Sequence, residues 1–369
     1  MGDIYIGLIS GTSMDGIDAA LVNIEESSLD VLQTHQHDYP AELRRRLSAA
    51  KLDASIRSFD DVADLHQQVG ECFRDAANEL LRIAGHDKSA VTAIGSHGQT
   101  IRHEPNIDDP YSLQIGDANI IASGTGITTI ADFRSADIAS GGQGAPLAPA
   151  FHEWLFDKDT STRVVLNLGG IANITILHGG SAPVTGFDTG PASTLMDAWI
   201  ARHRNEPFDR DGLWAAQGSV NADLLAKLLA DSYFAAPPPK STGFEYFNLE
   251  WLDAAGVAAY DPVDVQATLS ELTAVSVAEA VTEHARGTSD LFVCGGGVHN
   301  SELMRRLGAA LNGTQVRSTA SVGLDPDWVE AAAFAWLAMR STNGLPGNLP
   351  SVTGASRSVV LGSIFSVAR

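Results

Sequence analysis

Residues Ile4–Asp18 read I-Y-I-G-L-I-S-G-T-S-M-D-G-I-D, and this stretch predicts the plan of the rest of the chain. Its first half is a short apolar run rich in β-branched residues, which predicts a buried strand. A turn of small and hydroxylated residues follows, and a second apolar run, Ala19–Ile24, completes a hairpin. Unpaired backbone N–H groups in such a turn can hold an anion. Gly, Ser and Asp also dominate ordinary turns, so this stretch alone leaves the two interpretations equal.

Composition bounds the class of protein. A chain of 369 residues is long enough for two domains, and two cysteines are too few for a disulfide framework. The formal net charge of −21 argues against a nucleic-acid partner, because binding phosphate backbones needs a basic face. No apolar run is long enough to cross a bilayer, and the N-terminal residues are not a basic signal sequence. We therefore expect a cytoplasmic protein with neither a membrane nor a nucleic-acid partner.

Hydrophobic periodicity predicts alternating strands and helices. The expected helices are Pro40–Lys51, Phe59–Ile83, Ser193–His203, 210–232, Val265–Ala285 and Asp327–Met339, and the expected strands include Val91–Ser96, Ser112–Ile115, Ile120–Ser123, Ile127–Ala131 and Asp290–Cys294. At the last helix, Asp327 is expected to cap the first turn and Glu330 to complete a capping box. The glycines of Gly141–Gly144 mark the expected crossing between domains.

A second copy of the opening hairpin occurs at Arg163–His178. A strand at Val164–Leu166 is followed by the turn Asn167–Gly170 and a further strand at Ile174–Leu177. Two Gly-rich hairpins in corresponding halves of the chain indicate an internal duplication, with chance similarity as the alternative. The repeat favours a ligand shared by the two halves.

Several single residues are candidates for chemistry, each with a structural alternative. Asp188, between Phe187 and a turn, is the best general-base candidate, although the sequence slightly favours a helix N-cap. Gly295–Gly297 allow close approach of a ligand, or only a tight turn. Arg134 can bind a carboxylate or phosphate, or form a surface ion pair with a neighbouring aspartate. The histidines and cysteines show no metal-ligand spacing, and His97 can be an ordinary loop residue.

A series of motifs extends along nearly the whole chain: G-T-S-M-D-G-I-D (Gly11–Asp18), G-S-H-G-Q-T (Gly95–Thr100), Q-I-G-D (Gln114–Asp117), A-D-F-R (Ala131–Arg134), G-G-Q-G-A-P (Gly141–Pro146), N-L-G-G-I-A-N (Asn167–Asn173), F-D-T-G-P (Phe187–Pro191), P-P-P-K-S-T-G (Pro237–Gly243) and C-G-G-G-V-H-N (Cys294–Asn300). In this order the motifs resemble the anhydro-N-acetylmuramic acid kinase family, part of the actin, sugar kinase and heat-shock ATPase superfamily. One such motif is a weak signal, whereas the whole series in family order is a specific one.

The resemblance implies an α/β fold of two actin-like (ribonuclease H-like) domains, each a mixed sheet flanked by helices, with an ATP cleft between them. We expect domain I to span residues 1–134 and 341–369, and domain II to span residues 135–340. The implied enzyme is a phosphotransferase with an alcohol group as acceptor. It uses ATP and Mg²⁺ to open the 1,6-anhydro bond of anhydro-N-acetylmuramic acid with water and to phosphorylate O6, for peptidoglycan recycling. The expected partners are this amino sugar and ATP. A homodimer is one of the oligomeric states that the sequence allows.

The resemblance also implies roles for residues. Asp188 would be the base that activates the attacking water, and Arg134, Glu330 and His97 would lie on the sugar side. Contacts with ATP would come from Gly11, Thr12, Ser13, Met14, Asp15, Gly16, Ile17 and Asp18, from Asn167, Gly169 and Gly170, and from Gly295, Gly296 and Gly297. No side chain is assigned as a ligand of Mg²⁺.

This chain departs from the family pattern at two places. Ala192 and Ser193 follow D-T-G-P where the family usually has Gly or Ala and then Asn, and Phe244 stands where Arg is usual. Two alternative functions are a conventional sugar or polyol kinase, in which Asp188 deprotonates a hydroxyl, and a nucleotide-dependent chaperone-like ATPase. The last ranks lowest, because the chain has no evident segment for binding peptides.

Overall fold

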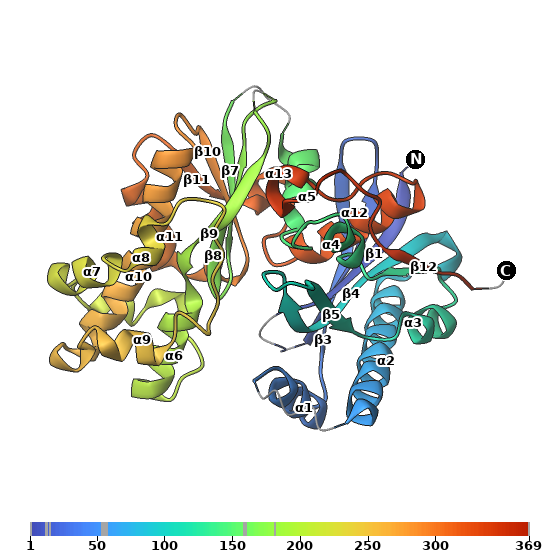
Figure 1. The fold of residues 1–369 in the computed structure, drawn as a ribbon, viewed down its shortest axis with the longest axis horizontal. Helices are drawn as coiled ribbons and strands as arrows, with labels where there is room; N and C mark the ends of the chain where they lie inside the picture. Colours follow the sequence, from blue (N-terminus) through green and yellow to red (C-terminus); the bar gives the residue numbers. More distant parts are fainter. Residues whose placement is uncertain are drawn as a thin grey trace. The chain divides into compact units, whose positions relative to one another are not determined.

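The structure is a computed structural model that describes residues 2–11, 14, 16–52, 58–157, 161–180 and 182–367. The chain divides into two compact units, Met1–Leu155 with Trp328–Arg369, and Phe156–Asp327. Each unit has its own β-sheet and helices (Figure 1). Each also has its own cluster of buried hydrophobic residues. Within the described ranges, no helix combines the length and the apolar character needed to span a membrane.

The first unit is built on a seven-stranded mixed sheet with the order β12-β6-β4-β1-β2-β3, in which β5 pairs with β4. Its strands are β1 (Asp3–Ser10), β2 (Gly16–Ile24), β3 (Leu29–Asp38), β4 (Val91–Glu104), β5 (Tyr111–Ile115), β6 (Thr129–Ala131) and β12 (Ser363–Phe365). β1, β2 and β3 are antiparallel neighbours, whereas β4 runs parallel to β1, and β6 parallel to β4. The predicted opening hairpin is confirmed as β1 and β2.

Helices α2 (Phe59–Ala84) and α12 (Val329–Thr342) cover opposite faces of this sheet. Ile6 of β1 belongs to the core cluster that contains the buried face of α2. Its neighbour Gly7 meets the backbone of α12 instead, and a Cβ on Gly7 would overlap the carbonyl of Ala331. Because successive side chains of a strand point to opposite faces, the two helices lie on opposite sides.

Local chemistry explains where the long helix α2 begins and ends. Ser58 precedes it, and its Oγ accepts the N–H of Asp61 at 3.1 Å, which satisfies one of the unpaired donors of the first turn. Gly85 follows it in the left-handed conformation, with φ of 64°. The apolar residues between these ends recur at helical spacing, so one face of the helix is buried.

The second unit is built on a five-stranded mixed sheet with the order β11-β10-β7-β8-β9. Its strands are β7 (Arg163–Leu168), β8 (Ile171–Leu177), β9 (Thr185–Pro191), β10 (Asp290–Cys294) and β11 (Gln315–Ser318). β7, β8 and β9 are antiparallel neighbours, β10 runs parallel to β7, and β11 parallel to β10. These pairings repeat those of β6-β4-β1-β2-β3, so the predicted repeat extends from the hairpin to the whole sheet.

Helix α10 (Pro262–His284) lies in the core of the second unit, where most of its residues are buried. Asp261 caps it by accepting the N–H of Val263. The remaining helical segments of the chain are α1 (Ala41–Leu52), η1 (Lys88–Ala90), α3 (Ala118–Thr125), α4 (Ser135–Ala139), α5 (Ala148–Phe156), α6 (Ser193–Arg204), η2 (Arg210–Gly212), η3 (Ala215–Gln217), α7 (Ala222–Leu229), α8 (Ser232–Ala235), α9 (Leu249–Ala254), η4 (Val257–Ala259), η5 (Gly296–His299), α11 (Ser301–Ala310), η6 (Thr319–Val322) and α13 (Pro350–Thr353). The predicted helix over 210–232 is thus divided into η2, η3 and α7.

The compact units differ from the predicted domains at both boundaries. Residues 135–155 and 328–340, expected in domain II, belong to the first unit. For residues 328–340 the reason is visible at Gly7 and Gly95, where missing side chains let the backbone of α12 approach β1 and β4. Such a contact joins residues far apart in the chain, so hydrophobic periodicity gives no sign of it.

Two predictions for β4 and the region after it are wrong. The expected strand Ile120–Ser123 lies inside helix α3, whose ends are Asp117, which accepts the N–H of Asn119, and the left-handed Gly126. β4 does not end at Ser96 but continues to Glu104, because its later part pairs with β5. The capping residues Asp117 and Gly126 therefore favour a helix more strongly than the β-branched residues between them favour a strand.

Candidate active site

Asp188 lies on β9 of the second unit, and its carboxylate is held at one oxygen. The side chain is half-buried, and Oδ2 accepts the N–H of Thr242 at 2.9 Å. Its backbone N–H donates to the carbonyl of Lys240 at 3.1 Å, and its carbonyl accepts the hydroxyl of Tyr233 at 2.7 Å. Oδ1 makes no hydrogen bond to any residue of the described ranges. The carboxylate therefore has one anchored oxygen and one that is available to a ligand.

The environment of Asp188 makes it more basic than an ordinary aspartate. Burial raises its pKa from 3.8 to about 6, and the hydrogen bond from the Thr242 N–H opposes this change. A carboxyl group with this pKa is ionised at neutral pH and is suited to accepting a proton. The interpretation of Asp188 as a helix cap is wrong, because Ala192 occupies the N-cap of α6 and no side chain caps that helix.

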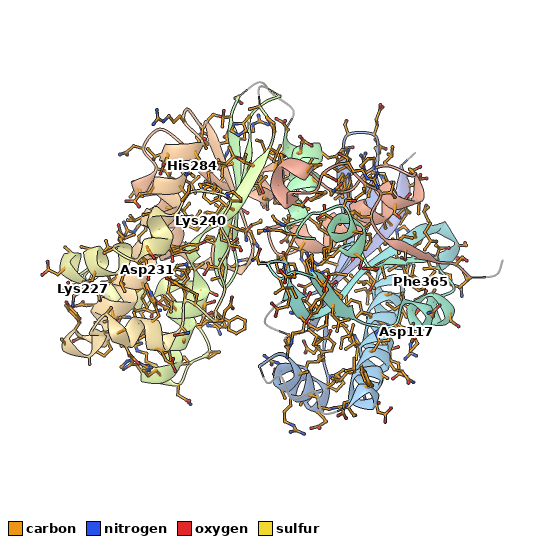
Figure 2. The ribbon with its side chains drawn as sticks, in the orientation of Figure 1. Asp117, Lys227, Asp231, Lys240, His284 and Phe365 are labelled. Carbon is orange, nitrogen blue, oxygen red and sulfur yellow. The ribbon has the colours of Figure 1, made fainter. Side chains whose placement is uncertain are left out.

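Lys240 fixes the proline-rich segment Pro237–Gly243 beside β9 (Figure 2). Its Nζ donates to the carbonyls of Tyr233 at 3.0 Å and Phe234 at 3.1 Å, and it lies 4.8 Å from the centroid of the Tyr233 ring. Both carbonyls belong to the short helix α8, whose C-terminal carbonyls have no partner within the helix. The Lys240 ammonium is thus used to hold the segment that supplies Thr242.

The predicted ATP contacts Asn167 and Gly295–Gly297 lie next to each other. Asn167, one residue before the end of β7, pairs with Cys294 at the end of the parallel strand β10, so both strands finish at the same edge of the sheet. Gly295 has φ of 80° and donates its N–H to Pro326 at 2.9 Å. A Cβ on Gly297 would lie 2.5 Å from the Cβ of Leu168, closer than side chains allow. Glycine is therefore required for the close backbone approach at this edge.

The turn at Gly169 and Gly170 is bound to the start of α6. The carbonyl of Gly169 accepts the N–H of Ser193 at 3.1 Å, and the carbonyl of Gly170 accepts those of Ala192 at 2.9 Å and Thr194 at 3.1 Å. The N–H groups of Ser193 and Thr194, the first two residues of α6, are thus paired inside the protein rather than left for an anion. This pairing fixes the turn between β7 and β8.

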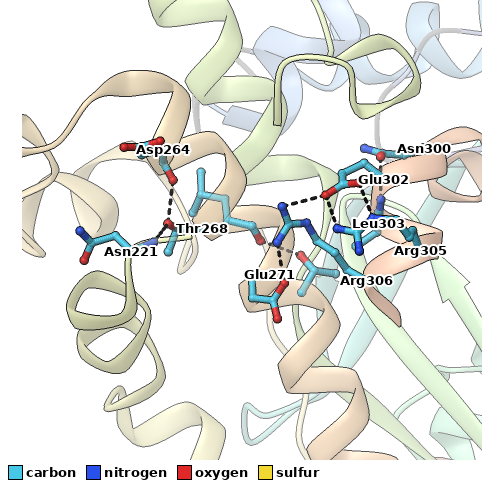
Figure 3. Close-up of polar contacts among 11 residues, drawn as sticks. Asn221, Asp264, Thr268, Glu271, Asn300, Glu302, Leu303, Arg305 and Arg306 are labelled. Carbon is cyan, nitrogen blue, oxygen red and sulfur yellow. Dashed lines mark hydrogen bonds and ion pairs between the residues drawn. The ribbon is translucent and has the colours of Figure 1, made fainter. Parts of the chain in front are cut away.

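A buried arginine fixes helix α11, which follows the Gly-rich segment, to α10 (Figure 3). The Arg306 side chain is 8% exposed and pairs with Glu271 at 2.6 Å and with Glu302 at 2.8 Å. Asn300 caps α11 by accepting the N–H of Leu303 at 2.9 Å. The segment Gly295–Gly297 is therefore held on one side by the hydrogen bond to Pro326. On the other side it is held by helix α11, whose Arg306 pairs with Glu271 of α10.

In the first unit, Gln99 of β4 fixes the start of the opening turn. Its Oε1 accepts the hydroxyl of Ser10 at 2.6 Å, and its Nε2 donates to the carbonyl of Gly11 at 3.2 Å. Sequence reasoning quoted Gln99 only as part of a motif and missed this role. The available signal was its place in the motif Gly95–Thr100, and in the structure Gln99 is 1% exposed.

The other residues of the predicted ATP turn have different surroundings. Thr12, Ser13 and Asp15 lie outside the described residues. Met14 is buried with φ of 55°. Gly16 starts β2, and Ile17 and Asp18 pair within the sheet. Because the Ile17 side chain lies in the hydrophobic core, a contact of Ile17 with a ligand would have to come from its backbone.

Arg134 and His97, both predicted on the sugar side, contact each other in the first unit. Nε and Nη2 of Arg134 lie 3.2 Å and 2.8 Å from Nε2 of His97, and Nη1 donates to the carbonyl of Gly144 at 2.7 Å. The expected surface ion pair is not formed, since Asp132 accepts the Ser135 hydroxyl instead. Burial lowers the pKa of Arg134 to about 10, while Glu330 and Asp137 raise it, so the guanidinium stays charged at neutral pH.

Glu330 lies in the first turn of α12 and does not form the predicted capping box. Trp328 occupies the N-cap without a side-chain bond, and Asp327 pairs with His299 at 2.8 Å instead. Glu330 is an exposed residue. Desolvation by the surrounding protein raises the pKa of its carboxyl group, and the charge of Arg134 lowers that pKa. Across the described ranges, no three His, Cys, Asp or Glu side chains are grouped so as to hold a metal ion.

The fold and these residues define a class of α/β protein with two sheets of one repeated topology, a basic carboxylate in one unit and a bound guanidinium in the other. The model of the family described as anhydro-N-acetylmuramic acid kinase matches residues 3–367. The chain belongs to this family. It is accordingly a phosphotransferase that uses ATP.

Three relatives named anhydro-N-acetylmuramic acid kinase show the extent of the similarity. The protein of Xanthomonas campestris pv. campestris is 52% identical over 366 residues, covering 98% of this chain and 97% of its own length. Those of Shewanella woodyi and Vibrio cholerae are 51% and 50% identical, and the alignments cover 99% and 98% of both chains. A solved ROK family glucokinase from Streptomyces griseus, in complex with glucose and AMPPNP, is 15% identical over 91% of this chain and 99% of its own, with a TM-score of 0.40 that is too low to support an argument.

Proposed function

We propose that the protein opens the 1,6-anhydro bond of anhydro-N-acetylmuramic acid with water and transfers a phosphoryl group from ATP to O6. The product would be N-acetylmuramic acid 6-phosphate, an intermediate of peptidoglycan recycling. The observation that carries this proposal is Asp188, a half-buried carboxylate with a pKa of about 6 and one oxygen left for a ligand. A cytoplasmic location and a homodimer stay predictions.

Asp188 would act as the general base for water. It takes a proton as the water oxygen bonds to C1 of the sugar, and the bond from C1 to O6 breaks. The base must lie on the face opposite the leaving oxygen, as in an inverting glycosidase. O6 receives the phosphoryl group, so no separate acid is needed for its departure. The buried Thr242 hydroxyl, which has no partner among the described residues, is a further polar group beside the carboxylate.

ATP would be bound by the turns at Gly11–Asp18 and Asn167–Gly170 and by Gly295–Gly297. The close approach at Gly297 and the positive φ of Gly295 support a segment that lets a ligand reach the backbone. Mg²⁺ would enter with ATP, because phosphate oxygens and water supply most of its preferred ligands. When bound, it would neutralise charge on the transferred group.

The sugar would contact the first unit at Arg134 and Glu330. The two are charge partners, since each shifts the pKa of the other in the direction that favours ionisation. The two units would close on both substrates, which would exclude water that could hydrolyse ATP.

Isotope labelling tests the proposed reaction. The protein is incubated with ATP, Mg²⁺ and anhydro-N-acetylmuramic acid in ¹⁸O-water, and one labelled oxygen should be found at C1 of the product, with stoichiometric ADP. Unlabelled product kept in ¹⁸O-water for the same time measures exchange at C1. Label in the phosphoryl group, or no ADP above background, would contradict the proposal. A conventional sugar kinase would instead phosphorylate reducing sugars at rates comparable to its rate with anhydro-N-acetylmuramic acid.

A further inference from the structure

The Arg134 guanidinium is held on two sides by the first unit. Nε and Nη2 donate to a single acceptor, Nε2 of His97, and Nη1 donates to the carbonyl of Gly144. A guanidinium has five N–H bonds, of which these contacts use three. Nη1 and Nη2 therefore each keep one N–H without a partner in the described part of the chain. Two such N–H bonds are the number that a carboxylate accepts when it binds in a bidentate manner.

The tautomer of His97 is set by its other nitrogen. Nδ1 lies 3.0 Å from the carbonyl of Gly98, which can only accept, so Nδ1 carries the proton and Nε2 is left as an acceptor. Burial and the charge of Arg134 keep the pKa of His97 well below its usual value, which keeps the ring neutral. The ring also packs against Phe334, with centroids 4.7 Å apart. His97 is 7% exposed, so it offers little surface to a ligand.

The carbonyl that holds the other side of Arg134 is fixed by a buried carboxylate. Asp137 is 0% exposed and accepts the N–H of Gly144 at 2.8 Å. Its other oxygen accepts bonds from Asn348 at 2.6 Å and Thr353 at 2.7 Å. The segment around Gly144 is thus anchored to residues near the end of the chain, and Arg134 lies between two fixed acceptors.

We propose that His97 is a positioning residue, which acts through Arg134 and orients its two free N–H groups toward the carboxylate of the sugar substrate. This inference rests on the proposed function and changes the expected role of His97 from direct sugar contact to support of Arg134. It also gives Arg134 a defined partner, the acid group that distinguishes an N-acetylmuramic acid derivative from the corresponding N-acetylglucosamine derivative.

Steady-state kinetics of His97 variants test the proposal. In His97→Phe, which keeps a ring but has no acceptor, KM for anhydro-N-acetylmuramic acid should rise about tenfold with kcat changed less than about threefold. In His97→Gln, Oε1 can accept from Arg134 and the amide can donate to Gly98, so KM should return to within about threefold of the wild type. For 1,6-anhydro-N-acetylglucosamine, which has no carboxylate, KM should be the same in all three proteins within about twofold.

His103 provides the matched control, because it lies on the same strand and bonds Ser112 at 3.0 Å. His103→Gln should leave KM for both sugars unchanged. Equal KM increases for both sugars in His97→Phe, or a wild-type KM in that variant, would overturn the proposal. If the wild type turns over neither sugar, the proposed function is wrong. The positioning role of His97 is then still tested by NMR, which does not need turnover.

The tautomer can be read from the unmodified protein. In ¹⁵N-histidine-labelled protein, the NMR shifts of His97 should show a protonated Nδ1 and an unprotonated Nε2 that accepts hydrogen bonds, assigned by comparison with His97→Gln. This measurement does not depend on turnover or on the stability of a variant. A protonated Nε2 at neutral pH would overturn the proposal, because Nε2 could then not hold Arg134.

Discussion

The two units share one strand order, but they use the equivalent strands differently. Strands β3 and β9 are equivalent edge strands, but β3 has alternating exposure, whereas β9 is buried towards its end and carries Asp188. The first unit carries its charged site after β6, at Arg134. The repeated topology therefore supplies similar turns in both units, and burial and side-chain contacts give each unit a different chemistry.

The packing of the two sheets differs as well. In the first unit, Gly7 and Gly95 bring the backbone of α12 against β1 and β4. In the second unit, large side chains such as Leu166 and Leu168 fill the corresponding central strand. The α12 face of the first sheet is thus covered by close backbone contact, whereas side-chain packing covers the central strand of the second sheet.

The largest expected effect comes from Asp188→Asn. Asn can still accept the Thr242 N–H but cannot take a proton, so kcat should fall by about 10²–10⁴-fold while ATP affinity changes less than about twofold. ADP release and calorimetric titration with ATP measure the two quantities. Asp30→Asn, an exposed residue of the equivalent strand β3, serves as control and should change neither. Equal loss of kcat and ATP affinity in Asp188→Asn would mean that Asp188 is structural.

Gly7→Ala tests the close backbone packing of α12 against β1 in the first unit. The new Cβ would overlap the carbonyl of Ala331 and lie 2.7 Å from the N of Ala335, and both are backbone atoms that cannot move independently. We expect the free energy of unfolding to fall by about 3 kcal/mol. Chemical denaturation measures it.

The control for Gly7→Ala lies in the second unit. Gly308 is inside α11 with open space around it, so Gly308→Ala should raise the free energy of unfolding by up to about 1 kcal/mol. Changes of the same sign in the two variants would show that the overlap at Gly7 is relieved by movement of α12.

The activity should depend on pH through the raised pKa of Asp188. A base must be ionised to accept a proton, so kcat/KM should rise with pH up to about 6 and then level off. Below about pH 5 the rate should fall about tenfold per pH unit. A pH–rate profile measures this, with the free energy of unfolding followed in parallel to exclude denaturation. A limb near the ordinary pKa of an aspartate, about 4, would contradict the role of burial.

The smallest effect is expected at Asp197, a second carboxylate of the second unit. Burial raises its pKa to about 6, the Ser193 hydroxyl lowers it and Asp209 raises it. The folded state therefore binds the proton more tightly than the unfolded state, and stability is lost as the pH rises from about 4 to 6. Asp197→Asn should be more stable than the wild type by about 1 kcal/mol at pH 7, a value reduced for partial solvent screening. The difference should vanish near pH 4.

Thermal unfolding of Asp197→Asn and the wild type at both pH values checks this prediction. The turnover of Asp197→Asn should stay within about twofold of the wild type, in contrast to Asp188→Asn. A variant that is less stable at pH 7 would show that the ionised carboxylate of Asp197 is favoured by contacts stronger than the cost of its burial.

Sequence reasoning succeeded where neighbours along the chain determine the structure. The hairpins β1–β2 and β7–β8, the strand Asp290–Cys294 and the long helices follow from hydrophobic periodicity and caps. The family motifs gave Asn167 and Gly295 only as ATP contacts, and their proximity to each other was not predicted.

It failed where partners are distant in the chain. Thr242 and Asp188, or Arg134 and His97, are brought together only by the folded sheet. At Asp327, a sequence typical of a cap was overridden by a tertiary contact with His299. In α3, the signals were present in Asp117 and Gly126, but the β-branched residues received more weight. Local patterns therefore predict elements, while side-chain partners depend on tertiary structure.

The division of the chain has a consequence for folding during synthesis. The second unit, Phe156–Asp327, is continuous. All of its residues are therefore synthesised before the chain returns to the first unit at Trp328. The first unit is interrupted, and α12 is made only afterwards. Until then Gly7 and Gly95 leave one face of the β1–β4 pair without its covering helix. Because domains generally fold as units, we expect the second unit to complete its core on the ribosome before the first, although the first begins earlier.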